Sequence, residues 1–417
     1  HNRATQPRKH CLQAVNCSSY WVLSPLVGAD DDNAMLEKIT GFRARRLLTP
    51  LDQQYLDLLS EEIASIGDEP VRYVGELFSR HQIVFVGQGT PSRKTGLFFQ
   101  ELVPKLLAAG VKNIGIEWAC VEDQSLLDAL VRADFFDEDL ARTALFRWGV
   151  RHHFAYIEYL DLFRAVWAIN RNNSNNGRDF RIVALDYDIE VTAVTSEADL
   201  TSPYAWEHLR PKGSSGRHMA EIILREFVDT GEKALIITRI AHAVSRLRRV
   251  PHHLEDSIDS EILNDRVVGA ANHVYSVIAD RAATVLIHQP LPADGVYGDY
   301  TLPGDGYLDA VFAASTRPKF PIAFNVNFGS ISKVPCSTSI DGGDLAAVAH
   351  GWIFLEAPSQ HVAPTPLPNR INESNIAEAR LYSLEPSLRQ ASSTEKDFTA
   401  ALFSAAAEAE LGWTQIV

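Results

Sequence analysis

Polar residues that could carry acid–base or binding chemistry stand at the ends of three apolar runs of this sequence. They are Gln88 after the run IVFVG, Glu117 in the run NIGIEWA, and Arg239 and His242 in the run EKALIITRIAHAV. In an open α/β sheet, ligands bind outside the carboxyl ends of the strands. If these runs are parallel strands, we expect the four side chains to lie around one crevice.

The residue types at these positions indicate possible roles. His242 is a candidate general base or metal ligand, because a histidine changes its charge near neutral pH and its neutral imidazole binds metal ions. Glu117 is a candidate for orienting that base or binding a substrate, since an acidic residue at the end of an apolar strand is costly to bury unless it is paired, hydrated or catalytic. Arg239 is a candidate for stabilising an oxyanion or for neutralising Glu117. A structural role is the alternative for Glu117 and His242.

The turn GQGTPSRKTG at 87–96 looks at first like an anion-binding loop. It is not a P-loop, because the four-residue spacing and the terminal Gly-Lys-Ser/Thr are absent. The alternative is a turn that caps a helix, with Thr90 or Ser92 as the N-cap residue.

Other polar residues near predicted strands are secondary candidates. Asp186 and Asp188 follow a further strand, so the argument used for Glu117 applies to them. His273 and His288 lie on or next to β runs and either line the crevice or pack in the core.

Neither histidine doublet is expected to form a two-ligand face, because neighbouring residues on a helix point in different directions. We therefore expect His152–His153 and His252–His253 on the surface or in loops. Tyr156 is expected at the core or its rim, although a tyrosine can also ligate haem iron.

The composition indicates a folded protein of 417 residues with one large domain or two ordinary ones. The hydrophobic content of 46% is ample for a packed core. A net charge of −14 argues against a general surface for nucleic acids or anionic membranes, which needs clustered basic residues. No apolar run is long enough for a transmembrane helix.

The four cysteines are too few for a disulfide framework and include no metal-type C-x-x-C pair. Cys11 and Cys17 either bridge in an oxidising compartment or remain free thiols in a loose arm. No secretory signal is present and the chain starts with His1, so both a cytoplasmic protein and one exported after removal of a leader remain open.

The chain divides into three expected parts. Residues 1–50 form an irregular arm with a short helical stretch at 34–48, residues 51–356 an α/β domain, and residues 357–417 a Pro-rich loop followed by two helices at 373–411. We expect the arm and the Ala-rich last helix to be the surfaces for a protein partner.

Within the α/β domain, apolar strands at 83–86, 111–118, 181–186 and 233–238 alternate with amphipathic helices. This alternation predicts a mostly parallel sheet with helices on both faces. From residue 272 onward the runs HVYSVIA, ATVLIHQ, PIAFNVN and GWIFLE predict extra strands that either extend the sheet or form a second layer.

The order of these segments resembles a superfamily that groups erythromycin-esterase-like hydrolases, ChaN-type haem-uptake proteins and Tiki-type metalloproteases. Its members carry a first strand that ends in a Gly-Glu-x-x-His-like motif, a second that ends in Glu, and a later one that leads to Gly-x-x-His-Ala. The matching stretches here are VFVGQGTPSRKTGLFF, NIGIEWA and EKALIITRIAHAV, and the resemblance spans roughly residues 70–355.

The departures from the family pattern fall on its chemical groups. Gln88 stands where the family has Glu, Pro91 where it has His, and Arg239 where it has Gly, while Glu117 and His242 are kept. Glutamine cannot accept a proton as a general base and is a poor metal ligand, and proline offers no side-chain ligand.

The resemblance with these departures implies three hypotheses. The first is a catalytically impaired member that acts as a binding or structural component, with a small-molecule ligand or a protein partner. The second is an active hydrolase of an ester or amide that uses His242, Glu117 and Arg239. The third is a protein that binds haem or a divalent metal, as the haem-uptake branch of the superfamily suggests.

Overall fold

The computed structural model describes most of the chain after the N-terminal arm. The described residues are 50–89, 91–172, 179–196, 198–199, 208–245, 268–289, 291–292, 300–301, 306–314, 319–336, 343–357 and 360–414. The arm with Cys11 and Cys17, the helical stretch predicted at 34–48, and the doublet His252–His253 lie outside these ranges.

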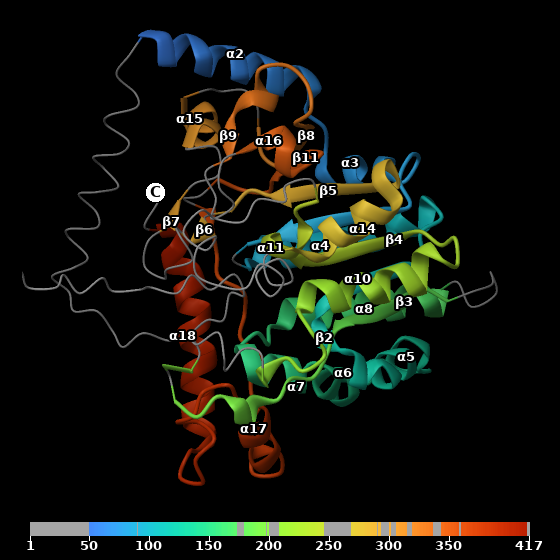
Figure 1. Ribbon diagram of the computed structural model, residues 1–417, viewed down its shortest axis with the longest axis vertical. Coiled ribbons are helices and arrows are strands. Elements are labelled where there is room, and N and C mark those ends of the chain that lie inside the picture. The colour runs from blue at the N-terminus through green and yellow to red at the C-terminus, as the bar shows by residue number, and fades with distance from the viewer. Residues whose placement is uncertain are drawn as a thin grey trace, which may run out of the picture.

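A seven-stranded sheet forms the centre of the described structure (Figure 1). Its strands in spatial order are β3 (Arg181–Asp186), β2 (Asn113–Cys120), β4 (Ala234–Arg239), β1 (Ile83–Gln88), β5 (Ala282–Ile287), β11 (Gly351–Phe354) and β8 (Ile322–Asn325). All neighbours pair in parallel except β8, which runs antiparallel to β11. The predicted α/β fold with a mostly parallel sheet is confirmed.

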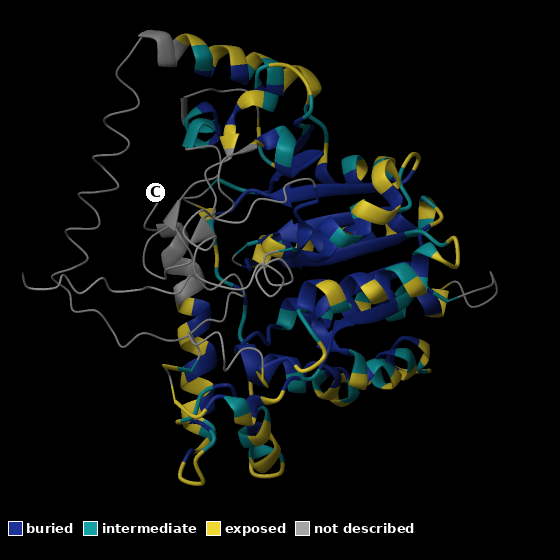
Figure 2. Cartoon of the chain, in the orientation of Figure 1, coloured by how far each residue is buried: buried dark blue, intermediate teal, exposed yellow. Residues whose placement is uncertain are grey.

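Alternate residues of every strand of this sheet except β2 enter two separate hydrophobic clusters, one on each face of the sheet. In β1, Val84 and Val86 belong to one cluster, and Ile83 and Phe85 to the other. The strands are therefore buried on both sides, which explains their continuous apolar sequences. Figure 2 shows the strands as buried throughout, whereas the helices expose their outer faces.

Helices from different parts of the chain cover the two faces. One face packs against α3 (Pro70–Leu77), α4 (Arg93–Ala108), α5 (Gln124–Arg132), α6 (Glu138–Ala144), α7 (Phe146–His152) and α8 (Ile157–Asn172). The other packs against α2 (Pro50–Ile66), α10 (Ser215–Ile223), α11 (Ile240–Ala243), α14 (Ala270–Ile278), α15 (Tyr307–Ala314) and α16 (Leu345–Val348). None of the helices in the described ranges combines the length and the apolar character that a bilayer crossing requires.

The C-terminal part of the chain returns to the α/β domain. As predicted it contains two helices, α17 (Ile376–Tyr382) and α18 (Glu395–Thr414). A small hydrophobic cluster joins Phe146 and Val150 of α7 to Leu388 and to Phe398 of α18. The C-terminal segment, residues 360–414, therefore packs against α7 (Figure 1).

The four predicted strands at 83–86, 111–118, 181–186 and 233–238 are confirmed as β1 to β4. Of the later apolar runs, three form β5, β8 and β11, which extend the same sheet. The prediction for HVYSVIA was wrong, because this run lies in helix α14. The buried residues of α14 include Ala270, Ala271, Val274 and Ile278, which share one face of a helix at a spacing of three to four residues.

Candidate functional site

The ends of β1, β2 and β4 bring the four predicted site residues to one edge of the sheet. Gln88 pairs in register with Arg239, and Glu117 lies on β2, the neighbour of β4 on its other side. His242 follows in the short helix α11, directly after β4. We call Gln88, Glu117, Arg239 and His242 together the strand-end site.

Arg239 binds both carboxylate oxygens of Glu117. The backbone N–H of Arg239 donates to Oε2 over 2.7 Å, and Nε and Nη2 each lie 2.5 Å from Oε1. Glu117 is only 1% exposed, so burying its charge requires a partner of this kind. This geometry corresponds to the neutralisation of Glu117, one of the two roles considered for Arg239.

His242 lies beside this ion pair without a hydrogen bond to it. Its Nε2 is 3.9 Å from Oε1 of Glu117, and its buried Nδ1 has no hydrogen-bond partner among the described residues. Burial lowers the pKa of His242 to about 4, against the opposing effect of the Glu117 charge. The imidazole is therefore neutral at pH 7.

A close approach of α11 to β1 sets the position of His242. A Cβ atom on Gly87 would lie 2.6 Å from a methyl group of Leu286 and 2.7 Å from Cβ of Ala243 in α11. Gly87 is therefore needed for α11 to pack this closely on the sheet, and this packing holds His242 next to Glu117.

Gln88 is 2% exposed and makes one weak hydrogen bond in this region. Its Nε2 lies 3.4 Å from the hydroxyl of Tyr159 in α8, and its Oε1 has no partner among the described residues. The ring of Tyr159 stacks on Trp118 with centroids 4.4 Å apart, and the indole Nε1 of Trp118 also has no partner in that part of the chain. Within the described part of the chain, Gln88, Trp118 and His242 thus each have one buried polar atom without a partner.

The turn after β1 is a helix cap, as its sequence suggested. Ser92 is the N-cap of α4, and its hydroxyl accepts from the backbone N–H of Thr95 over 3.0 Å. Gln289, which follows β5, accepts from the backbone N–H of Gly89 and donates to the Thr95 hydroxyl over 3.3 Å. Sequence reasoning did not single out Gln289, although its position after an apolar strand was the same signal that indicated Gln88.

Asp186 and Asp188 belong to a separate polar network. The Asp186 carboxylate accepts from Ser215 over 2.7 Å and from Trp148 over 3.2 Å, and lies 3.6 Å from Arg210. Asp188 forms ion pairs with Arg147 and Arg151. Both aspartates therefore have structural partners.

The histidine doublet of α7 was wrongly expected at the surface. His152 and His153 are 4% and 3% exposed, and His152 packs on Trp148 with ring centroids 4.4 Å apart. Nε2 of His153 lies 2.6 Å from Glu385 of the C-terminal segment. That segment, far away in the sequence, therefore contacts the end of α7 at His153.

His288 packs in the core. Its Nδ1 accepts from the indole N–H of Trp352 over 3.2 Å, so Nε2 carries the proton and donates to Asp309 over 2.9 Å. The ring also stacks on Phe354 at 3.9 Å. Both nitrogens of His288 are thus engaged in structural contacts.

The residues of the strand-end site do not fit a divalent metal ion. Position 88 offers an amide and position 91 a proline, and nowhere in the described ranges do three His, Cys, Asp or Glu side chains gather as metal ligands would. Tyr156, the tyrosine considered for haem iron, is fully buried among Phe154 and Tyr159 at ring distances of 5.4 and 5.7 Å.

No protein-family model matches this chain. No curated protein matches it either. Among solved structures, a succinoglycan biosynthesis protein aligns over 73% of this chain and 96% of its own, at 11% identity and a TM-score of 0.48. An erythromycin esterase in its open conformation aligns over 68% of this chain and 92% of its own, at 9% identity and a TM-score of 0.47. A Bacillus cereus protein aligns over 72% of this chain and 97% of its own, at 9% identity and a TM-score of 0.44. At these identities and TM-scores, the similarity assigns neither a family nor an activity to this chain.

Proposed function

We propose that this chain is a diverged member of the superfamily of erythromycin-esterase-like, ChaN-type and Tiki-type proteins, with a strand-end site that binds a ligand and has lost most hydrolytic activity. The ordered motifs around Gln88, Glu117 and His242 support the membership. The observation that supports the proposed loss of hydrolytic activity is the ion pair between Arg239 and Glu117.

This ion pair occupies the one carboxylate that the site retains. Because Arg239 binds both oxygens of Glu117, neither is directed at the ring of His242, which lies 3.9 Å away without a hydrogen bond. A histidine base needs an orienting partner within hydrogen-bond reach. Gln88 cannot replace the missing acid, because an amide neither accepts a proton nor carries a negative charge.

The polar atoms of the site indicate the chemistry of the ligand. Leaving a buried donor or acceptor unpaired costs about 1–3 kcal/mol. Gln88 Oε1 and His242 Nδ1 of the site, and Nε1 of Trp118, which follows Glu117 on β2, are all in this condition among the described residues. The charges of Glu117 and Arg239 offset each other, and His242 is neutral. The site therefore favours a small uncharged molecule with both donors and acceptors.

A set of size-matched probes tests this ligand chemistry. We expect acetamide to shift the indole N–H resonance of Trp118, assigned through Trp118→Phe, and acetate and methylammonium to leave it unchanged. The shift should be lost in Gln88→Met. At about 100 mM acetamide, the site would be nearly saturated even if Kd were well above 1 mM. A shift with acetate or methylammonium, or no shift with acetamide at this concentration, would therefore contradict an uncharged ligand.

One observation favours the alternative of an active ester or amide hydrolase. His242 is neutral, buried and within 4 Å of a carboxylate, as a general base could be. In that case hydrolysis would appear in the wild-type protein, disappear in His242→Ala, and remain nearly constant above pH 6, since a base with a pKa of about 4 is already deprotonated there.

The proposed binding role also includes a protein partner at the N-terminal arm and the last helix. In α18, Phe398, Leu402 and Ala405 are buried against the rest of the protein, whereas Phe403 is 55% exposed. We expect deletion of residues 1–45 to dissociate the native assembly and Phe403→Ser to weaken it. An assembly that survives both changes would exclude these surfaces.

A further inference from the structure

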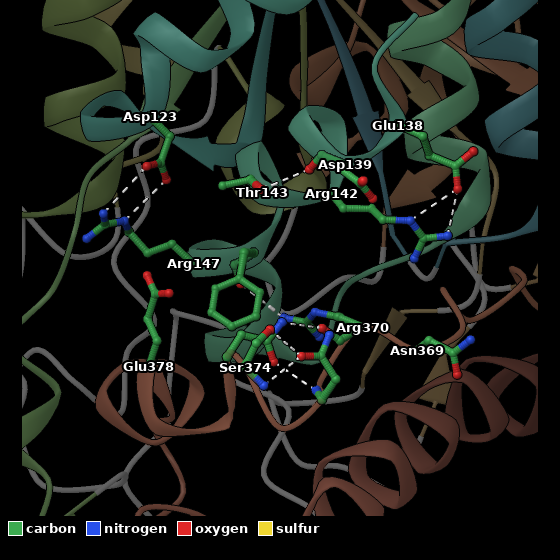
Figure 3. Close-up of a pocket in the computed structure, with 13 residues that line it drawn as sticks. Asp123, Glu138, Asp139, Arg142, Thr143, Arg147, Asn369, Arg370, Ser374 and Glu378 are labelled. Atoms are coloured by element: carbon green, nitrogen blue, oxygen red, sulfur yellow. Dashed lines mark hydrogen bonds and ion pairs between the residues drawn. The ribbon is translucent and has the colours of Figure 1, made fainter.

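A cavity of about 560 Å³ lies away from the strand-end site, between α6 and α7 on one side and the C-terminal segment on the other (Figure 3). Its wall is polar and consists of Asp123, Glu138, Asp139, Arg142, Thr143, Phe146, Arg147, Asn369, Arg370, Asn372, Ser374, Asn375 and Glu378. The volume is that of a site for a small molecule. None of the four residues of the strand-end site lines it.

Two of the three arginines in the wall already have carboxylate partners. Nη2 of Arg142 lies 2.7 Å from Glu138, and the same side chain donates to the carbonyl of Pro368 over 2.8 Å. Arg147 pairs with Asp123 over 3.2 Å and with Asp188 over 2.5 Å. These two side chains therefore have structural roles in the wall.

Arg370 is the third arginine, and it has no carboxylate partner among the described residues. Its guanidinium makes one hydrogen bond there, from Nη2 to the carbonyl of Phe146 over 3.1 Å, and its buried Nε has no partner. Burial lowers the pKa of Arg370 to about 9. Arg370 as a whole is only half-buried, but charges withdrawn from water in proteins are normally paired, so the wall holds a cation without an anion among the described residues.

Two carboxylates at the exposed part of the cavity also lack a partner. Asp139 and Glu378 are both exposed, and neither carboxylate forms a hydrogen bond or ion pair with a described residue. Figure 3 shows them on different elements of the cavity wall, Asp139 on α6 close to Arg142 and Glu378 on α17 on the side of Arg147. The cavity thus offers one positive position at its wall and two negative positions at its rim.

We propose that this cavity binds a zwitterionic small molecule of amino-acid to dipeptide size, with its carboxylate on Arg370 and its ammonium group at Asp139 or Glu378. A carboxylate is the anion that a guanidinium binds in bidentate geometry. The ring of Phe146, 6.0 Å below the guanidinium, provides an apolar surface for the rest of the ligand. This site is additional to the proposed function and does not depend on it.

Isothermal titration calorimetry with glycyl-leucine tests the proposal. Two derivatives serve as matched probes: the N-acetyl form, which lacks the ammonium group, and the C-terminal amide, which lacks the carboxylate. We expect the zwitterion to bind, and each derivative to bind at least about tenfold more weakly, because each loses one charge-assisted contact. Equal binding of all three, or no binding of glycyl-leucine at about 10 mM, would overturn the proposal.

Variants of the wall locate the binding. Arg370→Gln should weaken binding of glycyl-leucine at least about tenfold, and Asp139→Asn with Glu378→Gln should do so without affecting the fold, since both side chains are exposed. Arg142→Gln removes a paired arginine from the same wall and should change the affinity by no more than about threefold. Unchanged affinity in the rim double variant, or a loss in Arg142→Gln as large as in Arg370→Gln, would contradict the assignment.

Discussion

Arg239 binds the carboxylate of Glu117 through its backbone N–H and its guanidinium at once, over 2.5 to 2.7 Å. The carboxylate that the sequence suggested as a partner for His242 is instead half of a buried ion pair. The strand-end site is therefore described best as a salt bridge with neutral polar groups around it, and its most testable consequences concern stability as well as activity.

Removing the arginine of this pair should destabilise the protein strongly. Arg239→Ala leaves Glu117 buried without its partner, which costs about 3–5 kcal/mol in free energy of unfolding. Replacing both residues in Glu117→Gln/Arg239→Met removes the unpaired charge and should recover most of this loss. Urea denaturation of the two variants measures the effect, and a double variant no more stable than Arg239→Ala would mean that the pair is not the source of the loss.

The stability of the protein should fall in mild acid because of His242. Its pKa is about 4 in the folded protein and 6.5 in the unfolded chain, so the unfolded chain binds the extra proton between these values. The contribution of His242 is fully present above pH 6.5 and is lost as the pH falls towards 4, by about 3 kcal/mol over the whole window.

The variant His242→Gln isolates this contribution. Compared with the wild type, its free energy of unfolding should decrease less between pH 8 and pH 4.5, as measured by urea titrations at several pH values. Identical pH profiles for the two proteins would show that the imidazole is not buried in its neutral form.

Gln88 and Gln289 are two buried glutamines that should respond differently to the same change. Gln88→Met removes an amide with one weak hydrogen bond and an unpaired oxygen, so the free energy of unfolding should stay within about 1 kcal/mol of the wild type or rise. Gln289→Met leaves the Gly89 N–H and the Thr95 hydroxyl without this partner and should cost about 1–3 kcal/mol. Equal losses in thermal and urea unfolding would mean that the Gln88 amide is fully bonded in the native protein.

Because α11 packs closely on β1, adding one methyl group at Gly87 should lower the stability of the protein. Gly87→Ala places a Cβ against Leu286 and Ala243, where neither neighbour can move far, and should destabilise the protein by about 1–3 kcal/mol. Gly75→Ala in α3 would meet only Lys105, with Cγ at 2.8 Å and Cε at 2.9 Å. This side chain is flexible and can shift, and alanine favours a helix, so the variant should lose less than about 1 kcal/mol. Comparable stabilities of the two variants would contradict the close approach of α11.

The parallel sheet could be predicted because its strands are buried on both faces and read as continuous apolar runs. The same logic led to the wrong strand at HVYSVIA, since a short apolar run does not distinguish a strand from a buried helix. Including the preceding residues Ala270 and Ala271 extends the buried set to a helical spacing with Val274 and Ile278, and Val277 is 62% exposed. The hydrophobic spacing over the longer segment 270–278 is therefore typical of a helix.

Contacts between distant segments could not be predicted in this way. His153 contacts Glu385, more than 200 residues later in the chain, and the bond between Gly89 and Gln289 joins the ends of the neighbouring strands β1 and β5. Arg370 gave no local signal, because its unusual feature is the absence of an anion beside it in the described structure. Strand ends can be predicted from sequence, whereas the partners of their side chains depend on the complete fold.

The most direct test of the proposed function is the rate of hydrolysis of p-nitrophenyl acetate and of acyl anilides by the wild-type protein and by His242→Ala. With Glu117 held by Arg239, we expect both proteins to give the rate of the buffer alone between pH 6 and pH 8. Hydrolysis by the wild type that disappears in His242→Ala would contradict the account and identify His242 as the base of a working hydrolase.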